Sequence, residues 1–180
     1  MSLTSIESFW AASNASDKPT QLQRYIHKGS PECIKRFIAI GGGSKMGTTL
    51  EKFARFTFPK LQPRTHTGHD HTFPGIKTYK IEQKSSGHWG EDNYKWQHVE
   101  AKHDWDVLLL CGIDYHCIKF WVMNRTLFQT MLEEGRITNQ GNKNEESSQG
   151  VWFNYSDVKE VLIEVRTQDE LQAAIEVVPE

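Results

Sequence analysis

Two carboxylates and a lysine stand close together in the middle of the chain. Asp70 is separated by eleven residues from Glu82, and Gln83 and Lys84 follow directly. Mg²⁺ prefers oxygen ligands, so the two carboxylates can hold it with the backbone carbonyl of Gln83 and waters. A lysine partly desolvated beside a metal is biased toward its neutral form, so Lys84 can orient or deprotonate a water. Hydrolysis of a phosphodiester requires such a water and a cation that offsets the developing charge.

A strand has to position this group. Apolar and polar residues alternate over 76–85, which predicts a strand with Glu82 and Lys84 on one exposed face. The alternative is that these two residues belong to a solvated strand face with no chemical role.

The surrounding segments predict the elements that support this strand. Helical spacing of apolar residues predicts helices over 46–55 and 95–103. The run 107–113 is apolar on both faces, which is typical of a central strand covered by helices, and 117–123 predicts the next strand. A strand–helix–strand passage is therefore expected.

The two ends of the chain add weaker elements. We expect a short helix over 6–12, a helix over 127–132, an ambiguous strand over 158–165 and a final helix over 171–175. The placement of a threonine and a glutamate before the final helix is that of a capping box. No repeat or boundary is visible, so the sequence predicts one α/β domain over 1–180, with a mixed β-sheet flanked by helices on both faces.

Charge is unevenly distributed, although the net charge is only −2. Residues 1–65 hold ten Lys and Arg against four Asp and Glu, whereas residues 103–180 hold six against fourteen. This polarity permits a nucleic-acid face, but an uneven solvated surface would look the same. Three cysteines without a CxxC spacing argue against a disulfide framework, and the longest apolar run is too short for a bilayer. We therefore expect a cytoplasmic protein without a membrane partner.

The order of these motifs resembles the PD-(D/E)xK nuclease superfamily, and within it the type II restriction endonucleases. The matching stretches are GHD at 68–70, YKIEQKSS at 79–86 and KWQHVEAKHDWDVLLLCGI at 95–113. The match covers about residues 45–122, which would form the catalytic core. His69 stands where the family's name places a proline.

The resemblance implies a restriction-endonuclease-like fold with Mg²⁺ as cofactor. It implies metal binding by Asp70 and Glu82 and catalysis assisted by Lys84. It also implies supporting roles for Glu51 on the helix predicted over 46–55 and for Gln97 on the helix predicted over 95–103. The implied catalytic residues are Asp70, Glu82, Lys84, Glu51 and Gln97. Glu51 with Arg55 is also the ordinary surface ion pair of a helix, and Gln97 also fits the exposed side of its helix.

DNA specificity has to come from other residues, because the scissile phosphate is the same in every sequence. The polar loop 138–150 supplies amides for bidentate contacts with adenine and a lysine for guanine or phosphate, unless it is merely a polar loop. Small and aromatic residues after the predicted catalytic strand can approach the DNA backbone. The candidate DNA-binding residues are Ser85, Ser86, His88, Trp89, Lys95, Asn139, Gln140, Asn142, Lys143 and Asn144.

A zinc site is a rival interpretation, because His66, His69 and His71 flank Asp70. Zinc ligands usually come from separated elements or from regular helix spacing, and this stretch has neither. The histidines fit better as loop residues or as neighbours of DNA phosphates.

The combined prediction is a Mg²⁺-dependent type II endodeoxyribonuclease that cleaves double-stranded DNA to 5′-phosphate and 3′-hydroxyl ends. One catalytic centre per chain cuts one strand, so a twofold homodimer on a palindromic site is expected. The alternatives are a repair or junction-resolving nuclease of the same superfamily and a non-catalytic DNA-binding module that docks a protein through its acidic C-terminal half.

Overall fold

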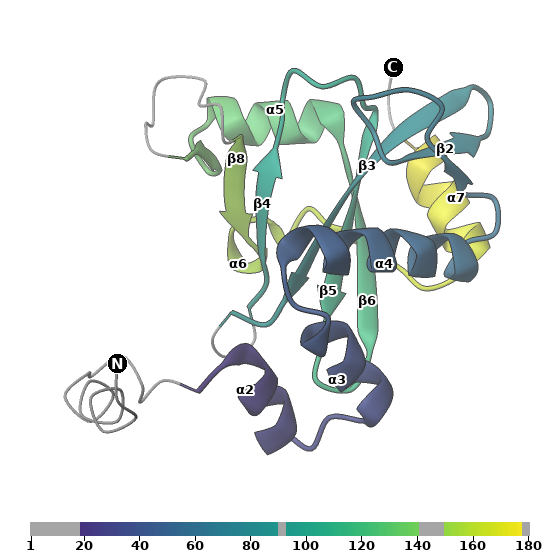
Figure 1. Ribbon diagram of the computed structural model, residues 1–180. Coiled ribbons are helices and arrows are strands. Elements are labelled where there is room, and N and C mark those ends of the chain that lie inside the picture. Colours follow the sequence, from purple (N-terminus) through teal and green to yellow (C-terminus); the bar gives the residue numbers. More distant parts are fainter. Residues whose placement is uncertain (1–18, 90–92, 141–149, 178–180) are drawn as a thin grey trace, which may run out of the picture.

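The computed structural model describes residues 19–89, 93–140 and 150–177, and it has a mixed α/β fold (Figure 1). The helix expected over 6–12 lies outside the described residues. The helices are α2 (Gln21–His27), α3 (Glu32–Ala39), α4 (Gly43–Thr57), α5 (Arg125–Glu133), α6 (Tyr155–Val158) and α7 (Gln168–Glu176). No helix in these ranges has the length and apolar composition needed to cross a membrane.

A six-stranded sheet organises the fold, with the order β1-β2-β3-β5-β6-β9. Its strands are β1 (Gln62–Pro63), β2 (His71–Pro74), β3 (Thr78–Gly87), β5 (Val107–Ile113), β6 (Ile118–Asn124) and β9 (Ile163–Val165). The pair β3–β5 is parallel and the other pairs are antiparallel. The sheet is therefore mixed, and β3 is an interior strand held on both sides.

Strand β5 is buried along its whole length, as its apolar run predicts. Leu109 packs into a core with residues of α2, α3, α4 and α7, whereas Leu108 packs into a second core with α5 and a small second sheet. Burying one such leucine stabilises the fold by about 1.5–3 kcal/mol. The prediction of a central strand covered on both faces is confirmed, although helices alone do not cover the second face.

The prediction of a helix over 95–103 is wrong. This segment contains β4 (Lys95–Val99), which forms a three-stranded sheet with β8 (Val151–Asn154) and β7 (Thr138–Asn139) in the order β4-β8-β7. A register shift lies between Trp96 and Val99, both fully buried. The extra residue of a bulge changes the spacing of inward-facing residues from two to three, which imitates a helix. The expected strand–helix–strand passage is therefore wrong as well, because β4 and loops connect β3 to β5.

The other predicted elements are present with shifted ends. Residues 46–55, 76–85, 117–123, 127–132 and 171–175 fall on α4, β3, β6, α5 and α7 respectively. The capping box of α7 forms, because the Thr167 Oγ1 accepts from the Glu170 N–H at 3.2 Å and a Glu170 carboxylate oxygen accepts from the Thr167 N–H. Of the ambiguous stretch 158–165, only the last three residues form a strand.

Candidate active site

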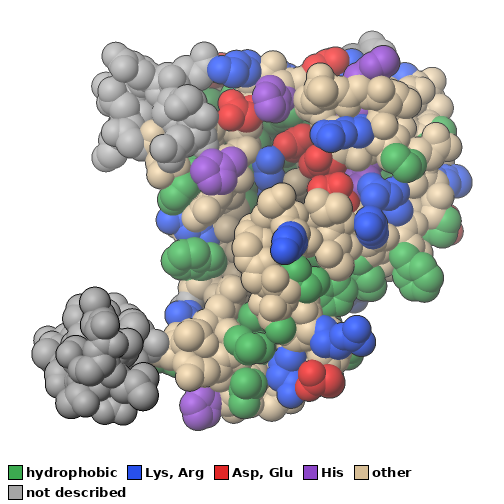
Figure 2. Space-filling view, in the orientation of Figure 1, with side chains coloured by type: hydrophobic (Ala, Val, Ile, Leu, Met, Phe, Trp, Pro, Cys, Tyr) green, Lys and Arg blue, Asp and Glu red, His purple; other side chains and the backbone are tan. Residues whose placement is uncertain are grey.

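A cavity of about 520 Å³ opens between α4, β3 and β4. Its lining includes Glu51, Asp70, Gln83 and Lys84. Figure 2 shows Asp and Glu side chains gathered in a hollow of this face, with Lys, Arg and His side chains around it. The predicted catalytic segments therefore meet at one opening, although they lie on three separate elements.

Two hydrogen bonds join Asp70 to the middle of β3. Its backbone N–H donates to the Ile81 carbonyl at 2.9 Å, and its Oδ2 accepts from the Gln83 N–H at 2.9 Å. The antiparallel pairing of β2 with β3 closes the eleven-residue separation. Because the N–H and C=O of one strand residue point to the same side, the Gln83 carbonyl faces the edge on which Asp70 lies.

Glu82 and Lys84 form an ion pair on β3. The Lys84 Nζ donates to the Glu82 Oε1 at 2.7 Å, and the two side chains are only 22% and 8% exposed respectively. The expectation of an exposed face is wrong here, because the strand lies beneath the hollow and not at the surface. The same low exposure contradicts the alternative of a solvated strand face.

Three carboxylates influence one another at this site. Burial raises the pKa of Glu82, the Asp70 charge raises it further, and Lys84 opposes the rise. Burial and Asp70 also raise the pKa of Glu51, against the opposing effect of Arg55 and Arg64. Keeping several ionised carboxylates close together in a partly buried site costs free energy unless a cation balances their charge.

The donor set suits Mg²⁺, because Asp70, Glu82 and the Gln83 carbonyl offer only oxygen atoms to a hard ion that keeps several waters. No three His, Cys, Asp or Glu residues in the described ranges are already arranged as a metal-binding group. Two carboxylates with a carbonyl and waters need no such group of three. Burial of Glu82 and Glu51 near the negative charge of Asp70 raises the pKa of both groups, and a cation bound here would offset that cost.

A buried chain of hydrogen-bonded polar side chains connects α4 to β3 through β2. The Arg55 Nη1 donates to the His71 Nδ1 at 2.9 Å, and the His71 Nε2 lies 2.9 Å from the Gln83 Oε1. Burial lowers the pKa of His71 to about 4, so at neutral pH the ring accepts from Arg55 and donates to Gln83. This chain positions the residue whose N–H holds Asp70.

Sequence reasoning missed this chain, because it paired Arg55 with Glu51. Among the ion pairs that the structure resolves, Arg55 makes none with Glu51, and its guanidinium reaches His71 instead. His71 and Gln83 are diagonal neighbours across the β2–β3 hairpin. The register of that hairpin would have revealed the contact.

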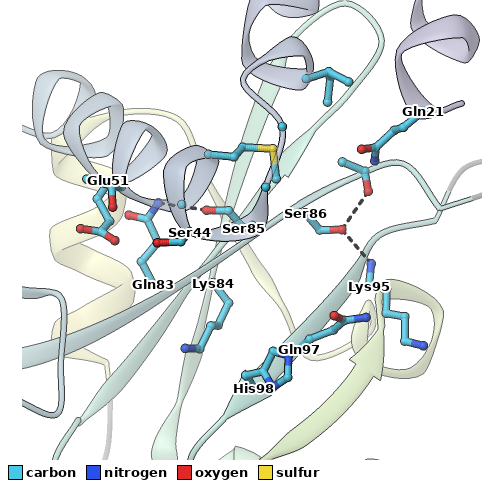
Figure 3. A pocket seen from close by; sticks show the side chains of 18 of the residues that line it. Gln21, Ser44, Glu51, Gln83, Lys84, Ser85, Ser86, Lys95, Gln97 and His98 are labelled. Atoms are coloured by element: carbon cyan, nitrogen blue, oxygen red, sulfur yellow. Dashed lines mark hydrogen bonds between the residues drawn. The ribbon is translucent and has the colours of Figure 1, made fainter. Parts of the chain in front are cut away.

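Glu51 and Gln97 stand on opposite walls of the cavity. Glu51 lies on α4 and lines the cavity together with Asp70. Gln97 lies on β4, so the supporting glutamine belongs to a strand and not to the expected helix. Figure 3 shows Gln97 with His98 on β4, extending to the same part of the pocket as Lys84.

Two predicted DNA-binding residues hold the protein together instead. His88 is only 4% exposed and is stacked between Tyr94 and Tyr115, with its Nε2 3.3 Å from an Asp114 carboxylate oxygen. Contact of His88 with DNA is therefore contradicted by its burial. The Ser86 hydroxyl is also buried, and it accepts from the Lys95 N–H at 3.1 Å, which ties β4 to β3.

The other predicted DNA-binding residues that the structure describes line one of two cavities. Ser85, Trp89 and Lys95 line the cavity, and Trp89 is 58% exposed. The Lys95 Nζ lies 4.6 Å from the Trp152 ring centroid and 5.7 Å from that of Trp89. Asn139 and Gln140 line a second cavity of about 310 Å³ beside Lys95. Asn142, Lys143 and Asn144 lie outside the described residues.

The zinc interpretation finds no support in the positions of its ligands. Both ring nitrogens of His71 are engaged by Arg55 and Gln83. His69 is buried at 3% exposure, whereas His66 is exposed. The three imidazoles therefore occupy different environments.

Comparisons with protein-family models, with curated proteins and with solved structures found no match to this chain. Its function is therefore inferred from the residues of this site.

Proposed function

We propose that this protein is a Mg²⁺-dependent endodeoxyribonuclease that hydrolyses phosphodiester bonds of double-stranded DNA. The observation that carries the proposal is the hydrogen bond between Asp70 and the Gln83 N–H, which joins a carboxylate to the strand of Glu82 and Lys84. This bond brings the Asp70 carboxylate next to the strand that carries the Glu82–Lys84 ion pair, although eleven residues separate Asp70 from Glu82 along the chain.

Asp70, Glu82 and the Gln83 carbonyl would hold the ion. When bound, Mg²⁺ supplies positive charge against the negative charge that develops on the phosphorus oxygens. The Gln83 N–H holds the Asp70 carboxylate and the Ile81 carbonyl accepts from the Asp70 N–H, so Asp70 needs little rearrangement to serve as a ligand.

Lys84 is the residue that acts on the attacking water. Its side chain is 22% exposed and lines the cavity, and its amine lies 2.7 Å from a Glu82 carboxylate oxygen. From this position it would donate a hydrogen bond to a water in the cavity and orient that water for in-line attack. Glu51, on the opposite wall, adds a carboxylate that accepts a hydrogen bond from the same water.

The finer proposal is a type II restriction enzyme that acts as a twofold homodimer and leaves 5′-phosphate and 3′-hydroxyl ends. One centre of this kind cuts one strand, so a double-strand break at a palindromic site needs two copies related by a twofold axis. Cleavage of plain duplex at fixed positions would distinguish this enzyme from a repair or junction-resolving nuclease.

The test is incubation with a large defined DNA in Mg²⁺, with and without EDTA. We expect discrete fragments from the wild type, and a rate about 10²–10⁴-fold lower for Lys84→Ala and Glu82→Ala. Lys77→Ala is the matched control, because it removes an exposed lysine near the start of the same strand. If the wild type cuts no DNA with any divalent ion, the nuclease proposal is wrong and the alternative of a non-catalytic DNA-binding module is favoured.

A further inference from the structure

The bulge of β4 turns two neighbouring polar side chains toward the candidate active site. In a regular strand Gln97 and His98 would point to opposite faces. Here both line the cavity, while Trp96 and Val99 on either side of them are fully buried. The register shift between those two buried residues produces this arrangement.

A glycine from a distant segment holds the bulge in place. His98 has a φ of +59°, the only positive value for a non-glycine residue among the described residues. Gly150, just before β8, has a φ of +69°, and a Cβ there would lie 2.9 Å from the Val99 carbonyl oxygen. Only glycine therefore allows β8 to approach the bulge this closely.

The two walls of the cavity differ in character. The β4 wall carries Lys95, Gln97 and His98, which all have long polar side chains (Figure 3). The opposite wall is the start of α4 and the turn before it, where Met46 and Glu51 are the large lining residues and most others are small. Its small lining residues are Gly42, Gly43, Ser44, Gly47 and Thr48. A nucleotide chain can therefore pass close to α4 while its bases face β4.

We propose that Gln97 and His98 are specificity-determining residues that bind the edges of the bases beside the scissile phosphate. This inference rests on the proposed nuclease function, because it places that phosphate at Lys84. A glutamine amide presents a donor and an acceptor that match N6 and N7 of adenine. An imidazole N–H donates to N7 or O6 of guanine. Gln97 thus acts on the bases of the substrate and not on the water.

The experiment is competitive cleavage of a pool of duplexes randomised in sequence, in Mg²⁺, with the cut products sequenced. The variants are Gln97→Ala and His98→Gly; glycine suits the positive φ and so removes the ring while keeping the bulge. Lys102→Ala is the matched control, because it removes an exposed cation just beyond β4 that does not line the cavity.

We expect Gln97→Ala to lose about 5- to 150-fold of the preference for one base at one position, since a bidentate base contact provides discrimination of that size. His98→Gly should lose a smaller preference at one position, because the imidazole N–H makes a single hydrogen bond. Cleavage of sequences that carry the preferred base should fall more than cleavage of sequences that lack it. An unchanged base preference in both variants overturns this inference and leaves the nuclease proposal intact. Equal loss of cleavage on all sequences also overturns it, and would give Gln97 a catalytic role. A wild type that cuts nothing overturns the nuclease proposal itself.

Discussion

The buried His71 makes a testable link between pH and stability. Its pKa is about 4 in the folded protein, lowered by burial, whereas an unfolded histidine has a pKa of about 6.5. Between these two values the unfolded chain binds more protons than the folded one, so stability is lost as the pH falls. From pH 7 to pH 5 the loss amounts to about 2 kcal/mol, and it approaches about 3 kcal/mol below pH 4.

The perturbation is His71→Gln, which removes the titrating ring and keeps one donor and one acceptor between Arg55 and Gln83. Urea unfolding followed by circular dichroism, at pH 7 and pH 5 in EDTA, gives the free energy of unfolding of each protein. The wild type should lose about 2 kcal/mol more than the variant between the two pH values. In thermal unfolding this corresponds to about 4–8 °C for a chain of this size.

The comparison isolates His71 because the other titrating groups are common to both proteins. Glu51 and Glu82 have raised pKa values and contribute with the opposite sign, but equally in each protein. His66→Gln, at an exposed site in the loop before β2, serves as the control and should keep the wild-type difference. If His71→Gln loses as much stability as the wild type between pH 7 and pH 5, then His71 is not the buried neutral group described above.

Three further predictions follow from packing and charge. Glu82→Gln should raise the melting temperature in EDTA, because it removes a buried carboxylate whose pKa is raised by burial and by Asp70, and it should abolish any stabilisation by Mg²⁺; scanning calorimetry with and without the ion measures both effects. Gly112→Ala should lower the free energy of unfolding by about 1–3 kcal/mol, since its new methyl group would lie 2.8 Å from a Trp121 ring carbon; urea titration measures this loss, and an unchanged midpoint would contradict it. Arg125→Met should lower the free energy of unfolding by about 1.5–3 kcal/mol, because the guanidinium donates to three backbone carbonyls of the turn at 101–105. If Arg125→Lys is as stable as the wild type, the several N–H donors of the guanidinium are not the cause of the stabilisation.

The parts of the fold that could be predicted are those with a local pattern. The apolar run of β5 and the helical spacing in α4 each occupy one segment, so the sequence alone was enough to predict them. The bulge of β4 depends on pairing with β8, more than fifty residues away, and on Gly150. Nothing within 95–103 contains that information, so its residues could only be interpreted by their spacing.

The candidate site divides in the same way. Asp70, Glu82 and Lys84 could be selected because one hairpin contains all three. His88 could not be placed, because its burial depends on Tyr94 and on Tyr115, which follows the far end of β5. The order of motifs along the chain therefore selected these three residues, whereas only tertiary packing shows which polar residues reach the cavity.

The separation of the two sheets has an evolutionary consequence. Glu82 and Lys84 lie on an interior strand whose neighbours tie it to the centre of the protein, so drift there is tightly constrained. Gln97 and His98 lie on the edge of a small peripheral sheet, where exchange of a side chain leaves the large sheet untouched. Under the proposed nuclease function, replacements of Gln97 and His98 would change the base preference while Asp70, Glu82 and Lys84 stay in place.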